Sequence, residues 1–122
     1  MTVAANILVG FVAALHLLFG AMEAFLWSKP AGRKIFKISR EEQEHGAVLA
    51  KNQGVYNWFL TAGLIWTFFM ADPTQALHTQ TFFLGCVAVA GLVGGITASR
   101  TIFAIQMLPG LLALGAVWGA AS

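Results

Sequence analysis

Long apolar stretches alternate with short polar ones along the chain, and this alternation predicts helices that cross a membrane. A spanning helix needs about 17–25 mostly apolar residues to traverse a hydrocarbon core of roughly 30 Å. We expect four such spans, at residues 3–27, 48–70, 81–98 and 101–120. The predicted fold class is therefore all-α, a single-domain integral membrane four-helix bundle with up-down-up-down topology.

Proline, glycine and capping residues indicate where the first two helices end and begin. Pro30 and Gly32 are expected to end the first helix. Ser39 followed by Glu42 fits a capping box, so the second helix should begin near Arg40 and enter lipid later.

Similar signals divide the second half of the chain. Asp72-Pro73 predicts a turn within a short loop at residues 71–79. Pro109 cannot donate a backbone hydrogen bond, so it should kink or locally open the last helix. Small residues at intervals of four would let helices approach closely. These stripes are Gly46, Ala50 and Gly54, then Gly91 and Gly95, and finally Gly115 and Gly119.

The composition agrees with residence in lipid. The 122 residues are 58% hydrophobic and 10% charged, whereas soluble domains are about 25% charged. The single cysteine, Cys86, excludes an internal disulfide and a cysteine-based zinc site.

The distribution of charge predicts the topology. All seven basic residues flank the first and third connections, and the second connection and both ends of the sequence carry none. They are Lys29, Arg33, Lys34, Lys37, Arg40, Lys51 and Arg100. By the positive-inside tendency, the basic loop at residues 28–44 faces the cytoplasm and both termini face the outer side.

Polar residues of three predicted helices fall at one depth, in the inner half of the bilayer, when depth is counted at about 1.5 Å per residue. His16 and Glu23 are two helical turns apart and share a face. Because a charge facing lipid costs roughly 2.5–3.5 kcal/mol, we expect the polar groups to turn inward around a ligand-binding pocket. The predicted pocket residues are His16, Glu23, Asn52, Gln53, Tyr56, Asn57 and Gln106.

The sequence does not decide which chemistry the predicted pocket performs. Glu23 fits either a proton-active or ligand-binding carboxyl group or a structural partner of Lys51, Arg100 or His16. The amides fit either a polar head group or hydrogen bonds between helices. His16 could bind a metal or haem, but a di-iron bundle needs a Glu-x-x-His pair in each half, which this sequence lacks. We therefore predict no metal site, and cofactor and catalysis stay open.

The whole chain resembles a group of small bacterial membrane proteins catalogued as domain of unknown function 1304. The resemblance rests on His16 and Glu23, Glu44-His45, the block Ala50-Lys51-Asn52-Gln53-Gly54-Val55-Tyr56-Asn57, and Gln106 with Pro109. Its most specific part is the pattern Asn-Gln-Gly-x-Tyr-Asn. The resemblance implies a four-helix protein of the bacterial inner membrane and transfers no catalytic role.

Three functions follow as hypotheses. The pocket would bind, or act on, a lipophilic molecule with a polar head group, such as a quinone or lipid. Alternatively, the small-residue stripes would make the chain a scaffold or accessory subunit of a larger membrane complex. Thirdly, a short four-helix chain with an acid in its first helix is similar to dimeric proton-coupled exporters.

The expected partners follow from the same patterns. They are the lipid bilayer, a lipophilic ligand, and a second copy of the chain or another membrane protein. No Gly-rich phosphate loop, catalytic Ser/His/Asp order or nucleic-acid motif occurs in the sequence, so nucleic acid is not an expected partner.

Overall fold

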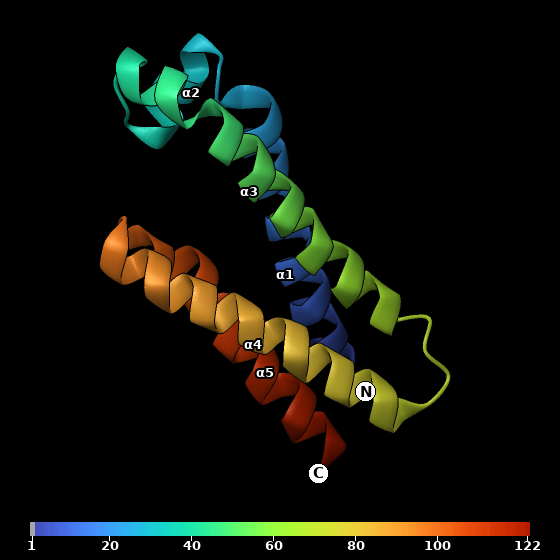
Figure 1. Cartoon of the computed structure of the whole chain (residues 1–122). Helices are drawn as coiled ribbons and strands as arrows, with labels where there is room; N and C mark the ends of the chain where they lie inside the picture. Colours follow the sequence, from blue (N-terminus) through green and yellow to red (C-terminus); the bar gives the residue numbers. More distant parts are fainter. Residues whose placement is uncertain (1) are drawn as a thin grey trace. The chain divides into compact units, whose positions relative to one another are not determined.

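The computed structural model describes residues 2–122, and every regular element in this range is helical. The elements are α1 (Val3–Ala21), the π-helical turn η1 (Met22–Leu26), α2 (Pro30–Phe36), α3 (Arg40–Thr67), α4 (Pro73–Thr97), the π-helical turn η2 (Phe103–Met107) and α5 (Leu108–Ala121) (Figure 1). The predicted all-helical fold class is confirmed.

Among residues 2–122, three helical stretches are long and apolar enough to cross a membrane: Val3–Leu26, Pro73–Thr97 and Phe103–Ala121. Their length and composition indicate a membrane protein. Helix α3 is longer, at 28 residues, but it is not among them. Its first half carries most of the acidic residues of the chain, which lowers its mean hydropathy. A membrane crossing by residues 48–70 therefore stays a prediction.

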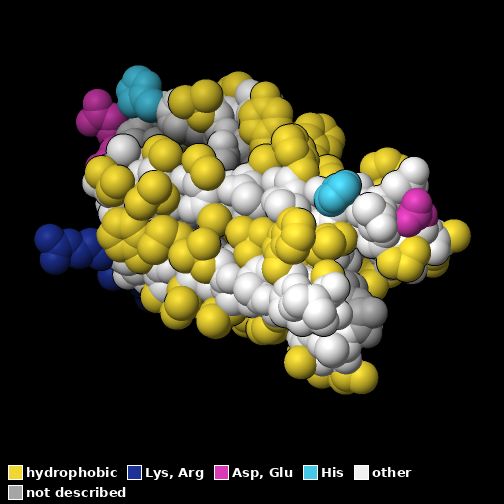
Figure 2. Space-filling model, turned by 90° about the horizontal axis from the view of Figure 1, so that it is seen from below, with side chains coloured by type: hydrophobic (Ala, Val, Ile, Leu, Met, Phe, Trp, Pro, Cys, Tyr) yellow, Lys and Arg dark blue, Asp and Glu magenta, His cyan; other side chains and the backbone are white. Residues whose placement is uncertain are grey.

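The outer surfaces of the helices are rich in large apolar side chains, as expected where lipid replaces water as the solvent. Phe69, Ile96 and Val3 expose 82%, 71% and 75% of their surfaces. Figure 2 shows hydrophobic side chains over much of the face in view. The same side chains would be a liability in water.

The helices form two compact units, and α1 and α3 contribute residues to both. The first unit contains the chain up to Ala14 together with Leu60–Ser122, and the second contains Leu15–Phe59. The hydrophobic core of the first unit draws on α1, α3, α4 and α5. Its fully buried members include Val9, Val12, Leu64, Leu84, Val87, Ala113 and Val117.

Within the first unit, α4 lies side by side with η2 and α5 (Figure 1). A Cβ atom added to Gly91 would lie 2.7 Å from the Cα atom of Met107, so only glycine permits this approach. The predicted close contact at Gly91 is therefore confirmed. Gly115 and Gly119 differ, since an added Cβ atom would meet no described atom within 4 Å.

The opening predicted at Pro109 takes the form of the π-helical turn η2, which ends two residues before it. Proline lacks the backbone N–H that an α-helical turn would use. A π-helical turn shifts the neighbouring hydrogen bonds by one residue and so accommodates this missing donor.

The connection between α3 and α4 differs from the predicted loop at residues 71–79, because α4 begins at Pro73. The Asp72 side chain accepts a hydrogen bond of 2.9 Å from the Thr74 N–H group, and Pro73 occupies the first helical turn. These are features of a helix start. The same residue types are also common in turns, which explains the incorrect prediction.

In the second unit, the predicted basic loop contains a short helix, α2. Pro30 occupies its first turn instead of ending the preceding helix, as suits a residue without an N–H group. Gln43 of α3 holds this segment: its side-chain amide donates to the carbonyls of Trp27 and Lys29, and its side-chain oxygen accepts from Arg33 at 3.1 Å. The α2 region is thus tied to α3.

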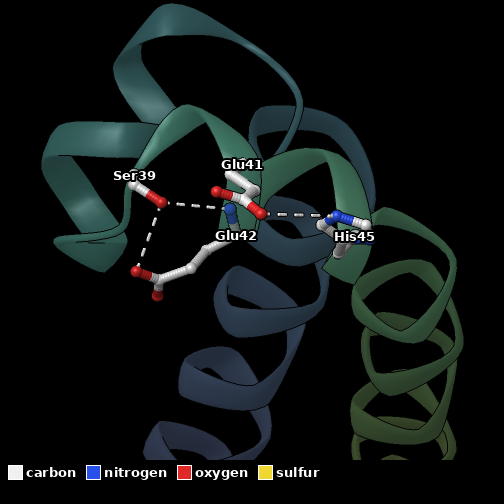
Figure 3. A network of polar contacts seen from close by, with 4 residues as sticks. All are labelled: Ser39, Glu41, Glu42 and His45. Atoms are coloured by element: carbon white, nitrogen blue, oxygen red, sulfur yellow. Dashed lines mark hydrogen bonds and ion pairs between the residues drawn. The ribbon is translucent and has the colours of Figure 1, made fainter.

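The start of α3 at Arg40 agrees with the predicted capping box. Figure 3 shows the arrangement: the Ser39 hydroxyl oxygen accepts from the Glu42 N–H group at 3.1 Å, and the hydroxyl group donates to Glu42 Oε1 at 3.3 Å. One turn further on, Glu41 and His45 approach to 3.9 Å at the surface. Exposed pairs of this kind contribute little stability.

Candidate functional site

The candidate site lies in the second unit, where η1 meets α3. The side-chain amide of Asn57 donates a hydrogen bond to Glu23 Oε1. Asn57 is 6% exposed, whereas Glu23 keeps part of its surface accessible. The acid of the first apolar helix therefore has a polar partner, as an ionisable group in a spanning helix requires. The observed partner is thus Asn57, whereas the sequence favours Lys51, Arg100 or His16 in this role.

Two glycines allow the helices to approach closely enough for this contact. A Cβ atom added to Gly20 would lie 2.7 Å from the Gly54 carbonyl oxygen, and one added to Gly54 would lie 2.7 Å from the Gly20 carbonyl oxygen. Each glycine precedes its hydrogen-bonding residue, Glu23 or Asn57, by three positions. Backbone contact at the glycines thus positions the two side chains.

The predicted stripe of small residues on α3 forms this contact surface. Ala50 is 6% exposed, and a Cβ atom added to Gly46 would lie 2.8 Å from the Trp27 ring. Nearby, the Trp58 indole N–H group donates to the Leu17 carbonyl at 3.2 Å. The stripe is therefore used within the chain itself.

Both π-helical turns contain a predicted pocket residue. Glu23 lies in η1, and Gln106 lies in η2. Well under 1% of residues in globular proteins are in π-helices, and π-helical turns occur frequently at functional sites. The backbone conformation therefore supports Glu23 and Gln106 as candidate site residues, independently of their side-chain chemistry.

The other predicted pocket residues differ in their surroundings. His16 is fully buried, and its ring packs edge-on against Phe19 with 5.3 Å between ring centroids. Asn52, Gln53 and Tyr56 are exposed on α3. Gln106 belongs to the first unit, so its convergence with Glu23 stays a prediction, as does ligand binding by the whole set.

Comparison with known proteins identifies the family. The family described as "Protein of unknown function (DUF1304)" matches residues 10–118. The chain belongs to this family. It is also 30% identical to "Uncharacterized protein YpaA" of Lactococcus lactis subsp. lactis (strain IL1403), over 93% of this chain and 96% of YpaA. No solved structure matches. The resemblance found in the sequence is thereby confirmed.

The matched range of this DUF1304 chain includes Glu23 and Asn57, so the site lies within the family region. A carboxyl group next to a carboxamide offers both hydrogen-bond donors and acceptors to a polar head group. Among residues 2–122, no group of three His, Cys, Asp or Glu side chains is arranged to hold a metal ion. The carboxyl and carboxamide groups of this site can form hydrogen bonds with a ligand.

Two buried glutamines of the DUF1304 chain escaped the sequence analysis. The burial of Gln43 was not predicted, because the neighbouring acidic residues suggested a solvated helix start. Gln80 is fully buried but fell at the edge of a predicted loop. Its spacing from Leu77 and Leu84, three and four residues away, follows the apolar stripe of α4 and could have revealed it.

Proposed function

We propose that this DUF1304 protein is a multi-pass protein of the bacterial inner membrane that binds a lipophilic molecule with a polar head group, such as a quinone or lipid, at Glu23 and Asn57. The observation that carries this proposal is the hydrogen bond between Glu23, in an apolar helix long enough to span a membrane, and the buried amide of Asn57. Ionisable groups inside membranes are costly, and they commonly mark functional sites.

The surroundings of the pair support a ligand as well as a structural contact. Glu23 keeps part of its surface accessible, so its carboxyl group can form a hydrogen bond with a ligand in addition to the one with Asn57. The π-helical turn η1 places Glu23 in a local backbone irregularity of the kind found at functional sites. Gln53 and Tyr56 provide further polar groups within about one turn of Asn57 on α3.

The test is native mass spectrometry of the detergent-extracted protein. We expect the wild-type chain to retain a lipid or quinone, and Glu23→Gln and Asn57→Ala to lose it, because each substitution alters one of the two groups that would hold the head group. Glu44→Gln is the matched control, since Glu44 is exposed at the start of α3 and should not affect retention.

Helix content, measured by circular dichroism, must be unchanged in both site variants. Retention of the ligand by Glu23→Gln and Asn57→Ala would refute the proposal, and so would equal loss in the control. Loss of folding in both variants would assign the pair a purely structural role instead.

A further inference from the structure

A cleft of about 530 Å³ opens in the first unit, where α3 ends and α4 begins. Its walls come from α1, α3, α4 and α5, through Asn6, Thr67, Leu77 and Val117 among others. Its lining, within the described residues, contains no Lys, Arg, Asp, Glu or His. The volume falls within the range of small-molecule sites, about 300–1,000 Å³.

Gln80 lies in the wall of this cleft with its side chain fully buried. The Thr67 hydroxyl group donates its single proton to the Leu64 carbonyl at 2.6 Å. Thr67 Oγ1 can therefore only accept from Gln80, which it does from Nε2 at 3.0 Å. The Gln80 amide is therefore oriented with Nε2 toward Thr67, and its oxygen, Oε1, does not contact the Thr67 hydroxyl group.

Gln80 Oε1 has no hydrogen-bond donor among the described residues, although it is buried. Buried acceptors are nearly always paired in native proteins, since an unpaired one loses its bond to water without replacement. No described group donates a hydrogen bond to Oε1, and Gln80 belongs to the lining of the cleft. A molecule that enters the cleft could donate this hydrogen bond.

We propose that this cleft binds a neutral amphiphile whose hydroxyl group donates a hydrogen bond to Gln80 Oε1. The ligand is neutral because no charged side chain lines the cleft to balance a charge. Its body is apolar because Leu77 and Val117 belong to the lining. This site is built from residues of the first unit alone, so it does not depend on the Glu23–Asn57 site of the second.

The test compares two isomeric probes, of which only one carries a hydroxyl group. Undecanol and decyl methyl ether have the same number of heavy atoms, but only the alcohol can donate a hydrogen bond. The protein is placed in phosphatidylcholine nanodiscs, and the methyl resonances of Leu77 and Val117 are followed by NMR during titration. We expect saturable binding of the alcohol, about tenfold tighter than that of the ether.

Two variants assign the effect to the cleft. Gln80→Met keeps the side-chain volume but removes Oε1, so alcohol affinity should fall about tenfold, to that of the ether, with ether affinity unchanged. Ala120→Phe places a large ring in the lining while keeping Gln80, so both probes should lose binding. Glu44→Gln, at an exposed residue of the second unit, is the control and should bind the alcohol like the wild type.

Equal affinity for the alcohol and the ether in the wild-type protein would overturn the proposal, as would unsaturable shifts with both probes. Undiminished alcohol binding by Ala120→Phe would place the site elsewhere and would equally overturn it. If Gln80→Met fails to fold, the comparison of the two probes and Ala120→Phe still decide.

Discussion

At the residue scale, the chemistry of single side chains identified Glu23 and Asn57 as candidates, but it could not pair them. The cost of polar groups in lipid predicted only that both turn inward. Two neighbouring stripes on α3 were equally suitable, one with Asn52 and Tyr56 and the other with Gln53 and Asn57. The contact between Gly20 and Gly54 selects neither pair as a whole: Gly54 and Asn57 are buried, whereas Gln53 is exposed like Asn52 and Tyr56.

The Glu23–Asn57 hydrogen bond should appear as an energetic coupling between the two residues. We expect a double-mutant cycle of Glu23→Leu and Asn57→Leu to give about 0.6–1.7 kcal/mol, the range of side-chain hydrogen bonds measured in a membrane protein. The measurement is reversible unfolding in mixed detergent micelles.

Asn52 provides the control for this coupling, because it is exposed on the same helix. A cycle of Glu23→Leu with Asn52→Leu should give a coupling near zero. Similar coupling energies for Asn52 and Asn57 would contradict a specific hydrogen bond between Glu23 and Asn57. They would show that Glu23 interacts with the polar residues of α3 in general.

At the scale of elements, one helix start with a side-chain cap was predicted correctly and another was placed too late in the sequence. Ser39 and Glu42 placed the start of α3 correctly. Asp72-Pro73 was wrongly interpreted as a turn, because the same residues favour turns and helix N-termini. The π-helical turns were not foreseen as such, although Pro109 predicted an opening near η2, since hydropathy has no signal for one additional residue in a turn.

The contact of η1 and α1 with α3 should depend on the absence of a side chain at Gly20. We expect Gly20→Ala to destabilise the protein by about 1–3 kcal/mol, because its Cβ atom would lie 2.7 Å from the Gly54 carbonyl oxygen and the backbones would have to separate. Unfolding in detergent measures this loss.

Gly10→Ala is the matched control in the same helix, since an added Cβ atom there meets no described atom within 4 Å. It should leave stability unchanged or raise it slightly, because alanine favours the helix. Equal destabilisation by both substitutions would show that helix α1 itself, and not its contact with α3, is sensitive.

At the scale of the whole molecule, composition predicted membrane residence, and three apolar helices agree with it. Composition could not predict the division into two units, because this depends on which parts of α1 and α3 pack with which neighbours. The number of crossings depends on α3, whose polar first half distinguishes it from the other long helices.

A reporter fused after Ser122 distinguishes four crossings from three. With the first connection in the cytoplasm, four crossings place the C-terminus outside, whereas three crossings by α1, α4 and α5 return it to the cytoplasm. We expect four, so alkaline phosphatase at this position should be active and green fluorescent protein dark.

A fusion after Lys37 is the internal reference, because the first connection should be cytoplasmic in either case and should give the opposite reporter pattern. A fluorescent C-terminal fusion with inactive phosphatase would exclude α3 as a crossing helix and would reduce the protein to three crossings.

The π-helical turns also have a consequence at the level of the gene. Each contains one residue more than regular α-helical geometry would need, so the side chains before and after it are offset by about 100° of rotation. Loss of a single codon within Met22–Leu26 would barely alter length or hydropathy. It would nevertheless rotate the residues after the deletion by about 100° relative to those before it, so the number of residues in this turn, and not only their types, determines which side chains face α3.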